Sequence, residues 1–439
     1  MRTLLRIACG LALVGTLGLL ALIYVPIQRT RALTDLPTDH LPASGAGKQV
    51  AVAADCMACH TAPGGRPFAG GRVIESPFGP IYSSNITPDR KTGIGDYTLD
   101  DFRAALYDGV RKDGVHLYPA MPYPSYRKMT EEDVRALYLY MMREVAAVES
   151  AAPVTSLSFP FNQRWGIRLW DWVSLPRAGF TPYMGDPQLD RGAYLVEALA
   201  HCGSCHTPRN ALTFAEKGYD ARSADFLTGA TVGGWPAPDL RARDSAAQQW
   251  SFAELAALLA SGRNETAGVS GEMAVAVEHS LQFLPKADLE AIVAYLKAAR
   301  QEQVATGIGI GTSPGSTTRD LEQASPELEL GARLYLDNCN ACHFTDGKGA
   351  KNVFPRLDGN ALVTSIEPGG LVSVILNGDA APSTISRPER LAMPGFGWRL
   401  SDDEVAALAT FVRKSWSNDA SAVTAETVAK FRRTAAAAP

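Results

Sequence analysis

The sequence contains one pentapeptide pattern three times: CMACH at residues 56–60, CGSCH at 202–206 and CNACH at 339–343. Six of the seven cysteines in the 439-residue chain lie in these copies. The final histidine recurs after 146 residues and again after 137. A period of this length is that of a domain, not of a short stacked repeat. The chain is therefore predicted to carry three tandem domains, each marked by one pentapeptide.

The C-x-x-C-H pattern is typical of c-type haem attachment. Its cysteines lie one helical turn apart, so each sulfur can form a thioether with one haem vinyl group while the adjoining histidine lies under the iron. A single C-x-x-C could also be a disulfide, a redox pair or half of a zinc site, but a zinc site needs a second pair about 15–20 residues away. Three copies with histidine predict three covalently bound c-type haems. The predicted residues are Cys56, Cys59, His60, Cys202, Cys205, His206, Cys339, Cys342 and His343.

A methionine follows each pentapeptide by 50 to 67 residues: Met121 in YPAMPYP, Met273 in SGEMAVAVEHS and Met393 in LAMPGFGW. A thioether sulfur opposite the histidine completes six-coordinate iron and raises its reduction potential. These three methionines are therefore the predicted second axial ligands, although a lone methionine can also be core filler. Met273 lacks the following proline, and His279 lies nearby as a rival ligand.

The remaining histidines are predicted not to bind iron. They are His40, His116, His201 and, unless it displaces Met273, His279. His201 directly precedes Cys202 and is expected to be an exposed or a capping residue.

Each methionine is followed by a predicted amphipathic helix. Thr130 with Asp133, and Ser401 with Glu404, have the spacing of helix-capping boxes. Apolar residues then recur at helical spacing. They are Val134, Leu137, Tyr138, Met141 and Met142 in the first copy, Leu289, Ile292, Val293 and Leu296 in the second, and Val405, Leu408, Phe411 and Val412 in the third. The predicted fold class is mainly α.

The N-terminus carries 19 uncharged residues from Ile7 to Val25. About 20 apolar residues span a bilayer core as a helix, whereas the apolar part of a signal peptide is shorter, roughly 7–15 residues. No small-residue cleavage site follows Val25, so residues 1–32 are predicted to be a retained membrane anchor rather than a removed signal segment. Cys9 lies inside it as an inert small residue. A net charge of −4 without a basic stripe argues against nucleic acid as a partner.

The three domains resemble class I cytochrome c. The third is the most similar, with CNACH, then FPRLDGN, then MPGFGW. In that family a proline carbonyl orients the axial histidine, which the resemblance transfers to Pro355 and His343. We therefore expect three tandem class I cytochrome c domains after an N-terminal transmembrane helix.

The chain from about residue 50 to 418 resembles the triple-haem cytochrome subunit of bacterial membrane-bound dehydrogenases. The resemblance rests on GGRPFAGGRVIESPFGPIYSSNITPDRKTGIGDYTLDDF, DGVHLYPAMPYPSY, NQRWGIRLWDWV and DRGAYLVEALAHCGSCHTPRN. The first domain departs from the family by opening with GKQVAVAADC in place of a fuller GxYLA helix.

The resemblance implies an electron-transfer subunit with no catalytic residues for the organic substrate. It would pass electrons from a catalytic dehydrogenase subunit to ubiquinone, with its domains on the periplasmic side of the inner membrane. Because the anchor is retained, the partner expected is a molybdopterin aldehyde dehydrogenase with a small iron–sulfur subunit. A quinoprotein alcohol dehydrogenase and a flavin-dependent gluconate or polyol dehydrogenase are the alternatives.

The expected layout also includes linkers and a tail. The ranges are 46–150, 184–302 and 327–418 for the domains, 151–183 for an aromatic linker, 303–326 for a flexible linker and 419–439 for the tail. The aromatic linker holds Trp165, Trp170 and Trp172, which either pack between the first two domains or contact the membrane or quinone. The tail is expected to form a short helix that docks on a partner or a membrane.

Other roles remain open at this stage. Asn85, Thr87 and Arg356 are either tuners of haem potential or turn residues. A multi-haem peroxidase would need a vacant iron site, and the second domain is the candidate because Met273 is the weakest ligand prediction. A sensor would need a signalling domain, and none is visible between residues 300 and 439.

Overall fold

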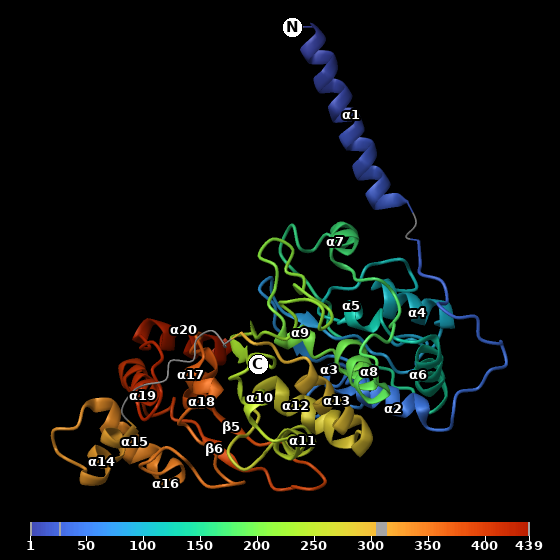
Figure 1. Cartoon of the computed structure of the whole chain (residues 1–439). Coiled ribbons are helices and arrows are strands. Elements are labelled where there is room, and N and C mark those ends of the chain that lie inside the picture. The colour runs from blue at the N-terminus through green and yellow to red at the C-terminus, as the bar shows by residue number, and fades with distance from the viewer. Residues whose placement is uncertain (1, 26–27, 304–313, 438–439) are drawn as a thin grey trace. The chain divides into compact units, whose positions relative to one another are not determined.

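The computed structural model describes residues 2–25, 28–303 and 314–437 (Figure 1). It begins with helix α1 (Arg2–Tyr24). Residues Arg2–Ile23 are the one segment of the described ranges that is long and apolar enough to cross a membrane, with a mean hydropathy of 2.1. The predicted apolar helix is therefore present, and length and composition alone fit an anchor or a signal sequence.

The chain forms two compact units. The first comprises residues 1–182, 197–201 and 210–215, and the second comprises residues 183–196, 202–209 and 216–439. The second and third pentapeptides thus lie in the same unit. The structure does not separate the second and third expected domains into units of their own.

The first unit holds the first repeat. Its elements after α1 are α2 (Ala46–Ala53), α3 (Cys56–His60), β1 (Val73–Ile74), β2 (Ile81–Tyr82), α4 (Leu99–Asp108), α5 (Tyr123–Tyr126), α6 (Glu131–Arg143), η1 (Arg164–Gly166) and α7 (Ile167–Ser174). Strands β1 and β2 form an antiparallel hairpin in which Val73 pairs with Tyr82. Thr130 caps α6 by accepting the N–H of Asp133, and Val134, Leu137 and Met141 are buried, as the helical pattern predicts.

The second repeat lies in the second unit except for residues 197–201 and 210–215, which belong to the first. Its elements are α8 (Pro187–Tyr194), the π-helical turn η2 (Leu195–Leu199), α9 (Gly203–His206), β3 (Ala230–Val232), β4 (Trp235–Ala237), α10 (Ala246–Gln249), α11 (Phe252–Ser261), α12 (Gly271–His279), η3 (Leu281–Phe283) and α13 (Lys286–Ala298). Strands β3 and β4 pair antiparallel, with Val232 opposite Trp235. Leu289, Ile292, Val293 and Leu296 of α13 are all buried, as predicted.

The third repeat completes the second unit. Its elements are α14 (Pro314–Gln323), α15 (Leu330–Asn338), α16 (Asn340–His343), α17 (Ala361–Thr364), α18 (Gly369–Asn377), β5 (Gly378–Ala380), β6 (Ala392–Pro394), α19 (Asp402–Lys414) and α20 (Ala425–Ala437). Strands β5 and β6 pair antiparallel, with Asp379 opposite Met393. The capping box between Ser401 and Glu404 is confirmed, and Val405, Leu408 and Val412 of the helix that it starts are buried.

A glycine brings the first and last helices of each repeat together. A Cβ on Gly47 of α2 would lie 2.2 Å from the carbonyl oxygen of Ala136 in α6. The same contact would be 2.0 Å between Gly192 of α8 and Ala291 of α13, and 2.4 Å between Gly331 of α15 and Ala407 of α19. No other residue lets these backbones approach so closely, because real Cβ contacts are longer than this. The three repeats therefore share one helix crossing, which the sequence analysis missed.

The segments that follow the second and third repeats hold helices that pack on the third repeat. Residues 304–313 of the flexible linker lie outside the described residues, but residues 314–323 form α14, whose Leu321 is buried in the core of the third repeat. The tail does form a helix, α20. Its Val428 is fully buried in that same core and Arg432 donates to the carbonyl of Leu400, so one face of the helix packs on the third repeat. Docking of the tail on a partner or a membrane stays a prediction.

Candidate haem-binding sites

Each pentapeptide histidine is held by a backbone carbonyl. His60 Nδ1 lies 2.7 Å from the carbonyl oxygen of Ser84, and His206 Nδ1 lies 2.8 Å from that of Pro238. His343 Nδ1 lies 2.9 Å from the carbonyl oxygen of Pro355, the partner that the family resemblance implies. A ring nitrogen that donates to a carbonyl leaves Nε2 unprotonated and fixes the ring plane, as metal-ligating histidines require.

A glycine also donates a hydrogen bond to the backbone carbonyl of each of these histidines. The carbonyls of His60, His206 and His343 accept the N–H groups of Gly70, Gly229 and Gly349, at 2.8, 2.8 and 3.3 Å. All three glycines have a positive φ. A Cβ on Gly70 would lie 2.5 Å from the backbone of Ser84, and one on Gly349 would lie 2.7 Å from the carbonyl oxygen of Pro355.

In the second repeat the glycine lies farther from the carbonyl that holds the histidine. A Cβ on Gly229 would lie 3.4 Å from the carbonyl carbon of Pro238. The histidine, the glycine and the orienting carbonyl thus form one device that occurs three times. The positive φ favours glycine at all three positions, and at Gly70 and Gly349 a Cβ would also displace the carbonyl.

The protonation of these side chains also fits haem binding. Burial lowers the pKa of His60, His206 and His343, which favours the neutral imidazole that binds iron. Burial also raises the pKa of the first thiols, Cys56 and Cys202, to about 12, as it does for Cys339.

The same features count against the other readings of C-x-x-C. A thioredoxin-like pair has a lowered thiol pKa, the opposite of what these cysteines show. Among the residues that the structure describes, no three His, Cys, Asp or Glu side chains gather as a metal site. The residues present therefore fit covalent haem attachment and neither a zinc site nor a redox-active cysteine pair.

The three candidate methionines lie on different kinds of backbone. Met121 lies in the loop two residues before α5, Met273 lies in the first turn of α12, and Met393 lies on β6. All three are half-buried. Met393 also packs against the core cluster of the third repeat, which contains Cys339. Their pairing with the histidines across the iron remains a prediction.

Comparison with known proteins identifies the family. The pattern of the family described as Cytochrome c matches residues 44–143 and 328–416. The chain is 41% identical over 395 residues to "Alcohol dehydrogenase (quinone), cytochrome c subunit" of Gluconobacter oxydans, covering 89% of this chain and 82% of the relative. This chain belongs to the family of dehydrogenase cytochrome c subunits.

Two further relatives support this membership. The cytochrome subunit is 42% identical over 403 residues to "Gluconate 2-dehydrogenase cytochrome c subunit" of Pantoea cypripedii, covering 88% of this chain and 89% of the relative. It is 40% identical over 415 residues to "Fructose dehydrogenase cytochrome subunit" of Gluconobacter japonicus, covering 90% of this chain and 83% of the relative. The family pattern does not extend over the second repeat, whereas these alignments span most of the chain.

The other histidines of the cytochrome subunit have different surroundings. His40 Nε2 lies 2.5 Å from Glu132, and buried His116 faces Asp171 with Nδ1 3.0 Å from a carboxylate oxygen. His201 is half-buried rather than exposed, and its Nδ1 lies 3.0 Å from the carbonyl of Leu199, the last residue of η2. His201 is thus the capping residue of the two roles expected. His279 ends α12, the helix that carries Met273.

Two of the candidate tuning residues organise a turn. Buried Asn85 donates from its side-chain amide to Thr92 Oγ1 and to the carbonyls of Val148 and Ser150. Thr87 donates to Asn85 Oδ1 from both its backbone N–H and its hydroxyl. Asn85 directly follows Ser84, so this turn supports the Ser84 carbonyl that holds His60.

Arg356 also belongs to a turn. Its side chain bonds the carbonyl and the carboxylate of Asp358. Arg356 is therefore a turn residue that directly follows Pro355, whose carbonyl holds His343.

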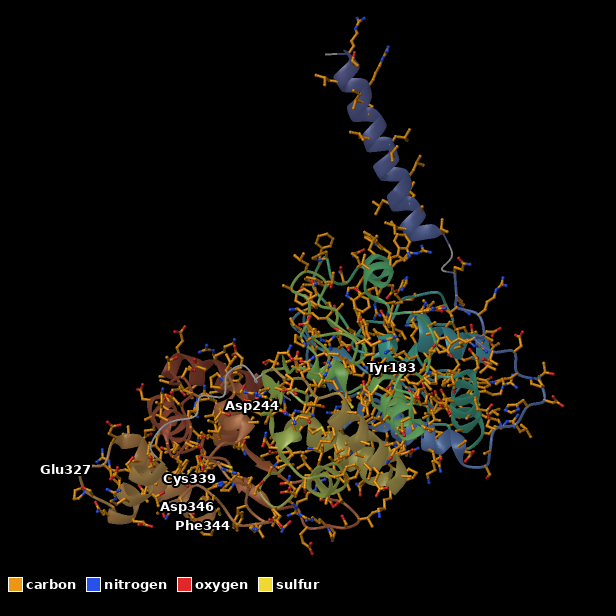
Figure 2. The ribbon with its side chains drawn as sticks, in the orientation of Figure 1. Tyr183, Asp244, Glu327, Cys339, Phe344 and Asp346 are labelled. Atoms are coloured by element: carbon orange, nitrogen blue, oxygen red, sulfur yellow. The ribbon has the colours of Figure 1, made fainter. Side chains whose placement is uncertain are left out.

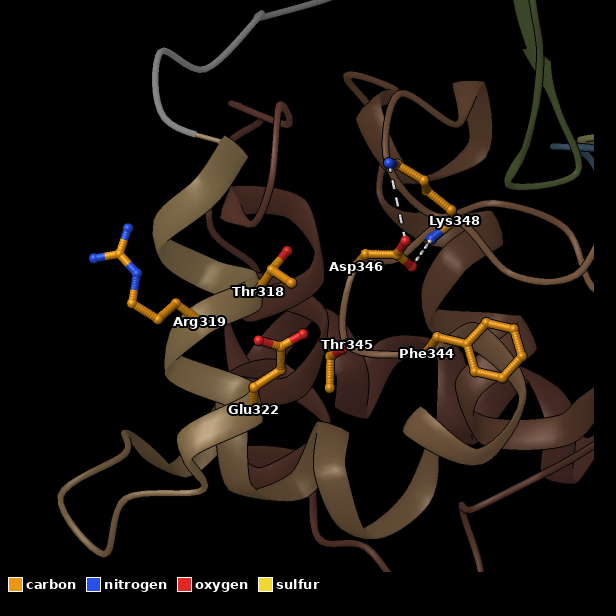
Figure 3. Close-up of a pocket in the computed structure, with 7 residues that line it drawn as sticks. All are labelled: Thr318, Arg319, Glu322, Phe344, Thr345, Asp346 and Lys348. Atoms are coloured by element: carbon orange, nitrogen blue, oxygen red, sulfur yellow. Dashed lines mark hydrogen bonds and ion pairs between the residues drawn. The ribbon is translucent and has the colours of Figure 1, made fainter.

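An open pocket of about 740 Å³ lies beside the third pentapeptide. Figure 2 labels Cys339 and Phe344, the first residue of that pentapeptide and the residue that follows it. Figure 3 shows that the pocket lies between α14 and the segment after His343, with Asp346 bonded to Lys348. Its lining residues are Thr318, Arg319, Glu322, Phe344, Thr345, Asp346 and Lys348. None of them is a predicted haem ligand, although Phe344 directly follows His343.

Proposed function

We propose that this cytochrome subunit relays single electrons through three covalently bound c-type haems, from a catalytic dehydrogenase subunit to ubiquinone. The observation that carries the proposal is the threefold recurrence of the histidine, glycine and carbonyl device. It supports a haem in the second repeat as well as in the two regions that match the family pattern.

The ligands define the chemistry of each centre. His60 with Met121, His206 with Met273 and His343 with Met393 would make three six-coordinate irons. Such iron has no open position for substrate, so it exchanges electrons and performs no substrate chemistry. For a one-electron step, a difference of about 59 mV changes the equilibrium tenfold, so modest differences in burial and ligation order the relay.

A contact inside the second unit supports a direct step between the second and third haems. The backbone N–H of Arg356 donates to the carbonyl of Thr266 at 2.9 Å, and that of Asn352 donates to the carbonyl of Glu265 at 3.0 Å. The segment that orients His343 through Pro355 is therefore bonded to the loop that leads to Met273.

The membrane side of the proposal rests on α1 and on the relatives. A retained α1 would hold the haem domains on the periplasmic side of the inner membrane. The word quinone in the name of the Gluconobacter oxydans relative supports ubiquinone as the acceptor.

The type of catalytic partner is the least constrained part of the proposal. The retained anchor favours a molybdopterin aldehyde dehydrogenase with an iron–sulfur subunit. The names of the three relatives favour partners that oxidise alcohols, gluconate or fructose. No observation favours a peroxidase.

Co-purification tests the proposal. The chain is solubilised from its native membrane, and its companions and their cofactors are identified by mass spectrometry. A dehydrogenase subunit that reduces these haems with its substrate supports the relay. A molybdopterin, quinoprotein or flavoprotein companion decides the substrate class. Oxidation of an alcohol or aldehyde by the isolated chain would contradict the proposal.

A further inference from the structure

Helix α7 is amphipathic in the reverse of the usual sense. Its buried face is polar: Arg168, Asp171 and Ser174 are 8%, 9% and 7% exposed. Its exposed face is apolar: Leu169, Trp172 and Val173 are 44%, 69% and 72% exposed. A helix on the surface of a soluble protein places its apolar stripe toward the core instead. The exposed side of α7 therefore suits an apolar surrounding.

Polar contacts of its side chains fix the orientation of α7. Asp171 Oδ1 accepts the hydroxyl of Tyr123 at 2.7 Å, and its other oxygen lies 3.0 Å from Nδ1 of His116. Trp170 Nε1 donates to the carbonyl of Thr213 at 2.6 Å. Turning the apolar face inward would break these buried polar contacts and leave their groups unsatisfied, which is costly. The exposure of Trp172 and Val173 is thus built into the fold.

Arg168 joins α7 to the end of the apolar helix α1. Its Nη1 donates to the carbonyls of Leu22 at 2.9 Å and Val25 at 2.8 Å. The last carbonyls of a helix have no partner within it, so the guanidinium caps α1. Figure 1 shows α7 beside the body-side end of α1. In a chain anchored by α1, these carbonyls mark the level at which the bilayer ends.

We propose that α7 lies in the headgroup boundary of the membrane, with Leu169, Trp172 and Val173 in contact with lipid. This rests on the part of the proposed function in which α1 is retained as an anchor. Tryptophan is enriched at membrane boundaries, and in-plane helices bury their apolar face about 5–10 Å deep.

The charges near α7 agree with an anionic lipid surface. Asp171 is the one acidic residue between Ser150 and Asp186, and it is buried. Exposed Arg177 lies just beyond the helix. The surface that α7 offers to lipid therefore carries no exposed carboxylate.

Contact of α7 with the membrane has a consequence for the first candidate haem site. Tyr123, which holds Asp171, lies two residues after Met121, the predicted ligand of that haem. Contact of α7 with lipid would bring the segment that follows Met121 close to the membrane, where ubiquinone resides. If Met121 binds the first haem, that haem would be the one placed to pass electrons to the quinone.

Spin labelling of the full haem-loaded chain tests the proposal. In a Cys9→Ser background, Trp172→Cys receives a nitroxide, and the chain is reconstituted in vesicles of phosphatidylethanolamine and phosphatidylglycerol. The matched control is Trp398→Cys, because Trp398 is also highly exposed, at 84%, but belongs to the third repeat. Collisions of the label with oxygen, which concentrates in lipid, and with a water-soluble nickel chelate are measured by power saturation, each against the same sample without either reagent, so that relaxation by the haem irons is common to both measurements.

We expect the label at 172 to collide more with oxygen and the label at 398 to collide more with the chelate. Equal access of the chelate to both labels would overturn the proposal. So would a label at 172 that oxygen cannot reach in the intact complex, because a partner subunit would then cover α7. Mass spectrometry of the N-terminal peptide tests separately whether α1 is retained, so failure of the anchor is distinguishable from failure of the α7 surface.

Discussion

The backbone nitrogen of Arg356 lies 2.9 Å from the carbonyl oxygen of Thr266, which joins the loops beside the second and third candidate haem sites. We predict that Arg356→Pro, which removes this donor, slows electron equilibration between the second and third haems. Arg356→Ala keeps the N–H and is the matched control. Flash reduction followed at the haem absorption bands measures the rate, with the haem content checked in parallel. Equal rates in both variants would show that this junction does not support the transfer.

Gly70→Ala should disturb the first haem. Its Cβ would lie 2.5 Å from the backbone of Ser84, whose carbonyl holds His60. The positive φ adds a strain of about 1–2 kcal/mol. Gly64→Ala is the control, since Gly64 has a similar φ of 69° but no atom within 4 Å of its Cβ position. We expect a shifted potential for one haem in Gly70→Ala and in that variant alone, measured by redox titration.

Met273→His should lower the potential of one haem of three and leave it low-spin. A second histidine removes the thioether that raises the potential, and axial ligands cover a range of roughly 0.8 V. Met273→Leu should instead give a high-spin signal, because leucine cannot bind iron. Potentiometry combined with electron paramagnetic resonance measures both. An unchanged second haem in Met273→Leu would transfer the ligand role elsewhere, with His279 as the first candidate.

Glu197→Gln should destabilise the first unit by about 3–5 kcal/mol, the usual cost of breaking a buried ion pair. Glu197 lies 3.1 Å from Lys128, and both side chains are buried. Asp220→Asn removes the carboxylate from the more exposed pair with Arg222 and should cost no more than about 1 kcal/mol. Calorimetry measures the stability of both variants. Similar losses of stability would show that the buried pair stabilises the fold no more than the exposed pair does.

Ser401→Ala should cost about 1 kcal/mol of stability in the third repeat, since it removes the hydroxyl that accepts the N–H of Glu404 at the start of α19. Hydrogen bonds from Ser401 hold the pKa of Glu404 below its ordinary value. The stabilisation is therefore present above the ordinary carboxyl pKa and is lost as the pH falls through the lowered value. Thermal unfolding at neutral and acid pH should show a difference between wild type and variant that shrinks in acid. A difference independent of pH would show that the Ser401 hydroxyl does not stabilise the Glu404 carboxylate.

The sequence predicted the local features of the fold because these depend on nearby residues. The helix from Asp402 follows from its capping residues and the period of Val405, Leu408 and Val412, and the structure confirms both. The contact of His343 with Pro355 came from family resemblance, since spacing alone does not reveal which carbonyl will face a ring.

Features that depend on distant contacts escaped prediction. Ser84 and Pro238 hold their histidines across 24 and 32 residues, and no local pattern marks their carbonyls. The recurring glycines before each pentapeptide, such as Gly192, were a signal in the sequence that alignment of the three repeats could have revealed. Helices α20 and α14 pack onto the third repeat through buried side chains such as Val428 and Leu321, and no local pattern shows which core a buried side chain will join.

The mass of the intact mature chain tests the central claim most directly. The account predicts a mass that includes three covalently attached haems, with peptides showing one on each of the three cysteine pairs. A chain with two haems, lacking the one at Cys202 and Cys205, would contradict it, because the second repeat would then share the geometry of a haem site without holding a haem.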